Sequence, residues 1–249
     1  MKPILAAVLI LCLTLTVACA FAADAVNASF YLSARDADVA LEDQKSVTSG
    51  ESLGDSLYIL TDKTLERWSA GDEAPAVVLD KIVNPDYVGD EQAVQDEKDG
   101  KLVLSRLFSS ADTLYGFSRL DGKVWKLADL SGPLATPEAA ATLAWDTMAR
   151  KSVDGDYTYY PQIGDMAVSG DTVIACTTDW NGDNPLYELI TWSLSTGKLI
   201  NDFHDLPIRT FTPYRDGLLL GKQFDDTKSW DEATQTAIMP TLVTVDIAT

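Results

Sequence analysis

The sequence predicts an all-β protein made of about four repeated units of antiparallel strands. One observation is a turn that recurs after strand-like runs, as Asp121-Gly122-Lys123 and as Thr196-Gly197-Lys198, with an unfinished copy at Asp246-Ile247-Ala248-Thr249. A second is that each of four apolar runs is preceded by a glycine that has an aspartate beside it or one residue away. These glycines are Gly54, Gly100, Gly170 and Gly217. The successive spacings are 46, 70 and 47 residues, and a unit of four strands takes about 40–50 residues. We therefore expect four-stranded units with an insertion in the long interval.

Residues 1–22 are expected to be a signal peptide. Lys2 supplies the positive charge, residues 4–17 are apolar, and Ala20-Phe21-Ala22 is a cleavage signal. The apolar stretch is too short for a membrane anchor, so no membrane span is expected after cleavage. The sequence therefore predicts export to the extracellular space, the periplasm or the cell surface. Because Thr16-Val17-Ala18-Cys19 is similar to a lipobox, a lipoprotein is the alternative.

The rest of the chain is expected to form an N-terminal segment, residues 23–46, and one domain, residues 47–249. The chain has 38 acidic and 19 basic residues and a net charge of −19. This charge argues against nucleic acid as a partner, because phosphates would be repelled. Cleavage would leave Cys176 without a disulfide partner, so the domain must be held by its core. Cys176 lies in the run 172–177 and is expected to be buried as a small apolar residue.

Within each unit, apolar runs are separated by short polar turns that favour strand hairpins. The strands expected are 57–61, 64–68, 102–107, 113–119, 123–128, 172–177, 186–193, 218–221 and 241–247.

The insertion is expected to be one short helix at about residues 137–150. Thr136-Pro137-Glu138 is typical of a helix start, with an N-cap, a proline in the first turn and an acidic residue. The segment that follows is rich in alanine. Leu143, Trp145 and Met148 would form its buried side.

The run from Leu189 to Lys198, an apolar strand that enters a Thr-Gly-Lys turn, resembles repeats of the β-propeller superfamily, of the quinoprotein-like and WD40-like kind. The resemblance covers residues 47–249 and implies blades arranged around an axis. It does not imply a pyrroloquinoline cofactor, because the regular tryptophan after Gly-Lys is missing. The last unit lacks a fourth strand, so we expect a C-terminally truncated chain from a propeller of about six to eight blades.

No residue set indicates a catalytic site. Gly50-Glu51-Ser52-Leu53-Gly54 has the G-x-S-x-G pattern of a nucleophile elbow, which needs a strand before the serine and a helix after it. Here the preceding run is polar and the following one is strand-like. The single histidine, His204, has no sequence feature that would bring a serine and an acid to it.

One polar segment is a candidate calcium site. Asp179, Asn181 and Asp183 place oxygen ligands at alternate positions, with Gly182 between them. The segment departs from the EF-hand pattern, because its glycine is fourth and its twelfth position is Ile190. The alternative interpretation is a polar turn that joins two strands. Apart from this calcium site, no cofactor is expected.

Two tryptophans are candidate ligand-binding residues. Trp180 and Trp230 lie in polar segments beside aspartate or asparagine, and such a pattern is typical of a platform on which a sugar stacks. Trp68, Trp125 and Trp192 lie in or beside strands and are expected in the core.

These observations favour an exported, non-enzymatic binding module that recognises a protein or a glycan through its loops. The alternative is the propeller domain of a larger secreted hydrolase or oxidoreductase whose catalytic part lies outside this chain. A third hypothesis is a structural domain of the cell surface that calcium stabilises.

Overall fold

The structure is a computed structural model that describes residues 47–152, 155–156, 158–181, 184–204, 206–215, 218–223, 230–231, 236–237 and 241–247. Most of the described chain lies in four antiparallel sheets, and each of the first three joins strands that are successive in the sequence. The first sheet holds β1 (Val47–Leu53), β2 (Ser56–Thr61), β3 (Leu65–Ser69) and β4 (Ala76–Leu79). The second holds β7 (Arg106–Ser109), β8 (Thr113–Phe117), β9 (Lys123–Asp129) and β10 (Gly132–Thr142).

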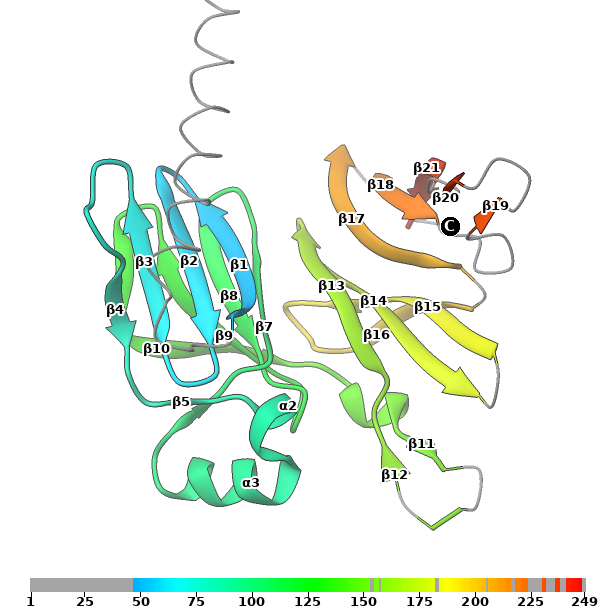
Figure 1. The fold of residues 1–249 in the computed structure, drawn as a ribbon, viewed down its shortest axis with the longest axis horizontal. Coiled ribbons are helices and arrows are strands. Elements are labelled where there is room, and N and C mark those ends of the chain that lie inside the picture. The colour runs from blue at the N-terminus through cyan, green and yellow to red at the C-terminus, as the bar shows by residue number, and fades with distance from the viewer. Residues whose placement is uncertain are drawn as a thin grey trace, which may run out of the picture.

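The third sheet holds β13 (Gln162–Ser169), β14 (Thr172–Asn181), β15 (Asn184–Ser193) and β16 (Leu199–His204). The fourth holds β17 (Ile208–Arg215), β18 (Leu218–Gln223) and β21 (Thr241–Asp246). The first strands of successive sheets lie next to one another, β1 beside β7, β7 beside β13 and β13 beside β17 (Figure 1). This arrangement of four blades confirms the predicted fold class, an all-β, β-propeller-like array.

The blades are held together by apolar side chains on both faces of their strands. In β14, Val173 and Ala175 pack in the cluster shared with the second sheet, whereas Ile174 and Cys176 pack in the cluster shared with the fourth. Successive strand residues point to opposite faces, so a strand between two blades must be apolar at nearly every position. This requirement explains the run 172–177. It also buries Cys176, as predicted, and burial raises the pKa of its thiol to about 12.

The core between the second and third blades is aromatic. Trp145 contacts Phe117 edge-on, with ring centroids 5.2 Å apart, and its ring lies 5.9 Å from that of Trp192. Trp68 and Trp192 are buried, as predicted, whereas Trp125 is only partly buried.

The predicted helix at 137–150 is wrong. Residues 137–142 belong to β10, which pairs with β9 through Glu138 and Lys126 and through Thr142 and Lys123. Only one turn of 3-10 helix, η1 (Trp145–Met148), follows. Pairing along β9 satisfies the backbone of β10, so tertiary contacts override the helix propensity of the alanines. Leu143, Trp145 and Met148 are nevertheless buried, as expected.

The helical insertion lies one interval earlier, between the first two sheets. It comprises β5 (Ile82–Val83), α2 (Pro85–Val88), α3 (Asp90–Lys98) and β6 (Leu102–Val103), and β5 pairs with β6 in parallel. Asn84 caps α2, because its side chain accepts a hydrogen bond from the Asp86 N–H at 2.9 Å. Gly100 therefore follows a helix and does not mark a hairpin. The hairpin of the second blade is turned by Ser110–Asp112 instead.

The two repeated Gly-Lys turns do not occupy equivalent places either. The turn with Gly122 joins the second and third strands of its blade, and the turn with Gly197 joins the third and fourth. Both turns nevertheless contact the same connecting segment. The carbonyl of Gly122 accepts a hydrogen bond from the Leu143 N–H, and that of Gly197 accepts one from the Ala144 N–H, each at 2.8 Å.

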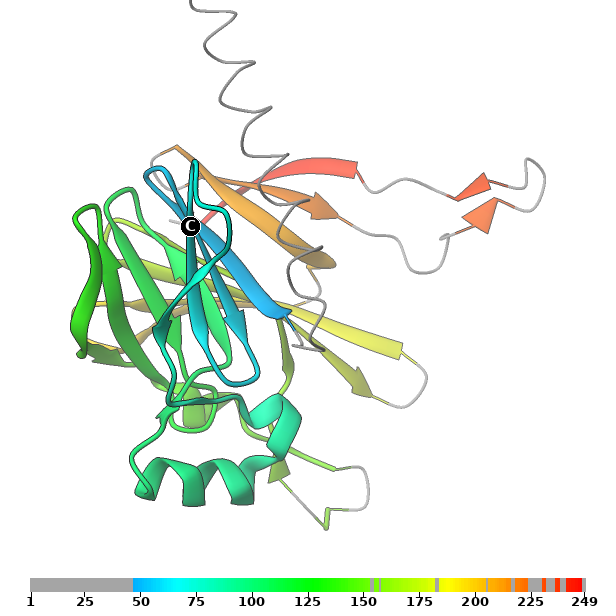
Figure 2. The ribbon, with the colours of Figure 1, turned by 60° about the vertical axis from the view of Figure 1, so that its left-hand side comes forward.

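Two small hairpins complete the described structure. One pairs β11 (Arg150–Lys151) with β12 (Thr158–Tyr159), and the other pairs β19 (Trp230–Asp231) with β20 (Thr236–Ala237). Helices α2 and α3 lie at the same end of the molecule as the β11–β12 hairpin, as both views show (Figures 1 and 2). Among the described residues, no helix is long and apolar enough to cross a membrane.

Candidate functional site

A polar cleft of about 750 Å³ lies at this end of the molecule, where the insertion, the starts of the inner strands and the β11–β12 hairpin meet. Its volume is in the range of small-ligand sites. Its lining residues are Val47, Thr48, Asp86, Tyr87, Asp90, Ser105, Arg106, Arg119, Thr158, Tyr159, Tyr160, Pro161, Gln162 and Ile163.

One wall of the cleft is a network of paired charges. Arg119 donates from Nε to Asp86 at 2.5 Å and contacts Asp90 through Nη2 at 2.8 Å. Arg106 lies 3.4 Å from the second oxygen of Asp86 and donates to the Ile163 carbonyl at 3.1 Å. Burial alone would lower the pKa of Arg119, but the hydrogen bonds and charges of Asp86 and Asp90 outweigh burial and raise it. The wall is therefore both fixed in position and electrically neutral.

Three tyrosines provide aromatic surface in the cleft. Tyr87, on α2, is 50% exposed, and Tyr159 and Tyr160 are partly buried. The ring of Tyr160 stacks on Trp145 at 5.7 Å, and its hydroxyl donates to Asp146 at 3.2 Å. Burial and the charge of Asp146 raise the pKa of this phenol. The Tyr160 ring is thus supported from behind by the aromatic core.

The β11–β12 hairpin is anchored to the third blade by two contacts. The Tyr159 hydroxyl donates to Asp179 on β14 at 2.9 Å. The Arg150 Nη2 contacts both carboxylate oxygens of Glu188 on β15, at 2.6 and 2.7 Å. These contacts fix the wall of the cleft that carries Tyr159 and Tyr160.

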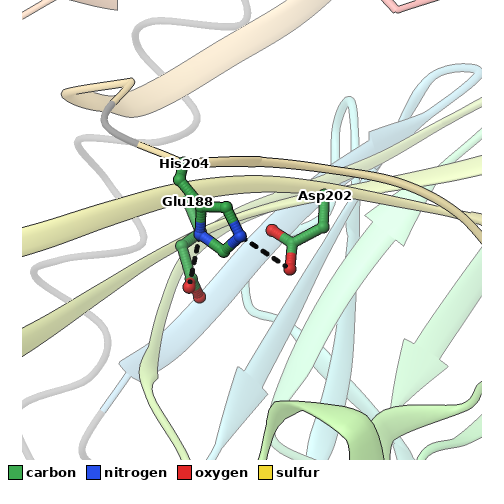
Figure 3. Close-up of side chains that lie close together, drawn as sticks. All are labelled: Glu188, Asp202 and His204. Atoms are coloured by element: carbon green, nitrogen blue, oxygen red, sulfur yellow. Dashed lines mark hydrogen bonds and ion pairs between the residues drawn. The ribbon is translucent and has the colours of Figure 1, made fainter.

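The anchor at Glu188 extends into a cluster with Asp202 and His204 (Figure 3). Glu188 lies directly across from His204 in the pairing of β15 with β16, and the His204 Nδ1 is 3.1 Å from its carboxylate. The His204 Nε2 faces Asp202 at 3.5 Å. Burial, and then the charge of Glu188, raise the pKa of Asp202.

Sequence reasoning missed this cluster because Glu188 and His204 are 16 residues apart, and only the register of β15 with β16 brings them face to face. Its carboxylate and imidazole groups are of the kind that bind transition metals. However, the guanidinium of Arg150 already occupies both oxygens of Glu188, and a positive charge there disfavours a cation. We therefore describe the cluster as a hydrogen-bonded extension of the Arg150–Glu188 ion pair that anchors the cleft wall.

A second group of polar residues lies on the inner strands. Glu51 on β1 accepts a hydrogen bond from the Ser109 hydroxyl on β7 at 2.9 Å. Asp165 on β13 accepts from the Phe211 N–H on β17 at 3.2 Å. Burial, opposed by the bond from Ser109 and assisted by the charge of Asp165, raises the pKa of Glu51 to about 7.

Two of the three predicted calcium ligands, Asp179 and Asn181, lie in the last residues of β14. Asp179 and the backbone of Asn181 belong to β14, and Asn181 pairs with Asn184. Asp183 lies outside the described residues, as do the side chains of Asn181, Trp180 and Trp230. The calcium site and the sugar platform at Trp180 and Trp230 therefore stay predictions.

No protein-family model matches the chain, and no curated protein sequence matches it. Among solved structures, a chain of a nidogen/laminin complex is similar, with 13% identity over 72% of this chain and 57% of that chain and a TM-score of 0.39. The β-propeller domain of Cps50 (Swd1) from Myceliophteria thermophila is 16% identical over 73% of this chain and 51% of its own, with a TM-score of 0.39.

The computationally designed protein Ika8 is 14% identical, over 77% of this chain and 47% of its own, with a TM-score of 0.39. This chain thus spans about half the length of these three structures. The assignment to the β-propeller class rests on the four sheets and their neighbouring first strands.

Proposed function

We propose that this chain is an exported binding module that recognises an uncharged oligosaccharide in the polar cleft. The observation that carries the proposal is the combination of three tyrosines with a fixed network of paired charges around a cleft of about 750 Å³. Sugar rings stack on aromatic faces, and carboxylates and guanidinium groups that are already held in place can bind sugar hydroxyls without further ordering.

The balance of charge supports an uncharged ligand. Arg106 and Arg119 face Asp86 and Asp90, so the ionisable groups of this network cancel. The chain as a whole is strongly acidic, with a net charge of −19, and its field would repel an anion. A cation would find no excess negative charge in this network.

The proposal predicts measurable binding of neutral trisaccharides. Maltotriose, cellotriose and N,N′,N″-triacetylchitotriose can be titrated into the protein by calorimetry. Tyr87→Ala should weaken the binding of whichever sugar binds by about tenfold, because one stacking surface is lost. The control is Val88→Ala, which removes an exposed apolar residue of the same helix that does not line the cleft.

Loss of affinity in both variants would point to a general effect on α2 and would contradict a role for the Tyr87 ring. If none of the three sugars binds, and a protein partner binds in a way that Tyr87→Ala abolishes, the ligand of the cleft is a protein and not a glycan.

Export is tested separately: the secreted chain should begin after Ala22 when its mass is measured, and a mass that still includes residues 1–22 would contradict it.

An enzymatic domain is the second candidate function, and the observation that favours it is the polar group on the inner strands, where the Ser109 hydroxyl on β7 donates to Glu51 on β1 at 2.9 Å. A carboxyl group with a pKa of about 7 is suited to general acid–base catalysis near neutral pH. Two results would establish this alternative over a purely binding role. The protein should have a hydrolase or oxidoreductase activity that Glu51→Gln abolishes, and the Glu51→Gln variant should still bind its sugar.

A further inference from the structure

Three aromatic rings form a continuous path from the core to the polar cleft. The rings of Trp192 and Trp145 have centroids 5.9 Å apart, and the ring of Tyr160 stacks on Trp145 with centroids 5.7 Å apart and planes 17° apart. Trp192 and Trp145 are 0% and 1% exposed, whereas Tyr160 is only partly buried and lines the cleft. We call these three rings the aromatic path. It begins in the core between the second and third blades and ends at a surface that small molecules can reach.

The residues of the aromatic path differ in what can accept their protons. The Tyr160 hydroxyl donates to the Asp146 carboxylate at 3.2 Å, and Asp146 is exposed. Within the described part of the chain, the Nε1 atoms of Trp145 and Trp192 are buried and have no hydrogen-bond partner. The phenol therefore has a base beside it, and neither indole has one.

This difference decides which residue of the path loses an electron most easily. A phenol that has lost an electron is a strong acid, so a carboxylate that takes its proton makes the loss more favourable. An indole that cannot release its proton remains a radical cation, and a charge in an apolar core is unfavourable. Because neighbouring rings of the path are in contact, an electron can pass from one ring to the next. An oxidising equivalent on either indole should therefore move to Tyr160.

We propose that Tyr160 is a redox-active residue, at which the chain gives one electron to a one-electron oxidant such as an oxygen-centred radical. The oxidant is reduced by one electron, the phenolic proton passes to Asp146, and Tyr160 becomes a neutral phenoxyl radical. When Trp145 or Trp192 is oxidised first, an electron moves from Tyr160 along the aromatic path to the indole radical cation and restores the indole. The proposal does not depend on the function proposed for the cleft.

The experiment oxidises tryptophan in the whole chain and locates the radical that results. Light at the long-wavelength edge of the indole absorption ejects electrons, hexaamminecobalt(III) accepts them, and 2-methyl-2-nitrosopropane traps radicals as covalent adducts. Mass spectrometry of peptides then maps the adducts. Tyr160 should carry most of the tyrosine adduct and more than Tyr87, although the Tyr87 side chain is 50% exposed. More adduct at Tyr87 than at Tyr160 would overturn the proposal.

A pair of matched variants tests the proton acceptor. Asp146→Asn keeps the size of the side chain but removes the base, so it should reduce the yield of Tyr160 adduct by at least about tenfold. Asp55→Asn, in the turn between β1 and β2, changes an exposed aspartate outside the cleft and should leave the yield unchanged. Equal yields in Asp146→Asn and in the unchanged chain would overturn the role of Asp146.

Two further variants test the aromatic path, with the radicals counted by electron paramagnetic resonance after rapid freezing. Trp145→Phe keeps an aromatic ring in the core but removes the indole that contacts both Trp192 and Tyr160. An indole radical cation does not oxidise phenylalanine, so the tyrosyl signal should fall and the tryptophanyl signal should rise. Tyr160→Phe leaves both indoles in place and should raise the tryptophanyl signal in the same way.

Thermal unfolding shows whether each variant keeps its fold. If Trp145→Phe does not fold, Tyr160→Phe decides the matter, because an unchanged tryptophanyl signal in that variant would overturn the transfer of the electron from Tyr160.

Discussion

Two glycines with a left-handed backbone differ in whether another segment packs against them. Gly197 has a φ of +68°, and a Cβ at this position would overlap the Thr142 carbonyl. Gly170 has a similar φ of +58°, but a Cβ there would meet nothing within 4 Å. Both positions have a left-handed backbone, but only at Gly197 would a side chain clash with a neighbouring segment. Comparing variants at the two positions therefore distinguishes the cost of backbone strain from the cost of the clash.

Gly197→Ala is expected to lower the free energy of unfolding by more than about 2 kcal/mol, because backbone strain adds to a clash with another segment. Gly170→Ala should cost only about 1 kcal/mol, from backbone strain alone. Denaturant unfolding of both variants gives the comparison. Equal losses of unfolding free energy in the two variants would mean that the end of β10, at Thr142, moves aside without a cost in stability.

Glu51 should make the stability of the protein depend on pH. Its pKa is raised from 4.5 to about 7 in the folded state, so between these values the folded state binds more protons than the unfolded state. Stability contributed by protonated Glu51 is therefore present at low pH and is lost as the pH rises from about 5 through 7. Asp165, whose pKa is also raised by burial, acts in the same direction.

Glu51→Gln should accordingly be more stable than the unchanged chain at pH 8, by at most about 3 kcal/mol, and equal to it near pH 4.5. Urea unfolding across this pH range measures the difference. Glu138→Gln, at an exposed position of β10, is the control for the change from glutamate to glutamine. A Glu51→Gln variant that is less stable at pH 8 would contradict the argument.

At the scale of elements, the β11–β12 hairpin depends on the ion pair of Arg150 with Glu188. The side chain of Glu188 is 10% exposed, so removing its partner leaves a buried charge. Arg150→Gln should lower the free energy of unfolding by about 2–4 kcal/mol, and adding Glu188→Gln should recover part of the loss. Lys151→Gln, in the same hairpin but exposed, should have little effect. A double variant no more stable than Arg150→Gln would argue against the buried charge as the cause.

Strands were more predictable than the segments between them. Runs such as 172–177 are apolar at nearly every position because both faces of the strand pack on a neighbouring blade, and this pattern is visible in the sequence. The segment 137–142 has alanines that suit a helix, and only its pairing with β9 makes it a strand. The true helical insertion did have a local signal, since Asn84-Pro85-Asp86 combines an N-cap, a proline and an acidic residue.

At the scale of the whole molecule, repeated sheets could be predicted and the candidate sites could not. The cleft joins Asp86 and Arg119 with Tyr160, and the aromatic path joins Tyr160 with Trp145 and Trp192, so each site depends on contacts between distant segments. The Gly-Lys turns show the same limit of prediction, because the same two residues join different pairs of strands in two blades. Local patterns report strands and turns, whereas a site requires the packing of blades.

The segment from Thr142 to Ala144 links the folding of two blades. Its amides donate to Gly122 in the second blade and to Gly197 in the third. Opening either turn breaks a hydrogen bond to this segment, so we expect local unfolding of one blade to loosen the other. The Leu143 and Ala144 amides should therefore show one common free energy of opening in hydrogen exchange, set by the joint opening of both blades.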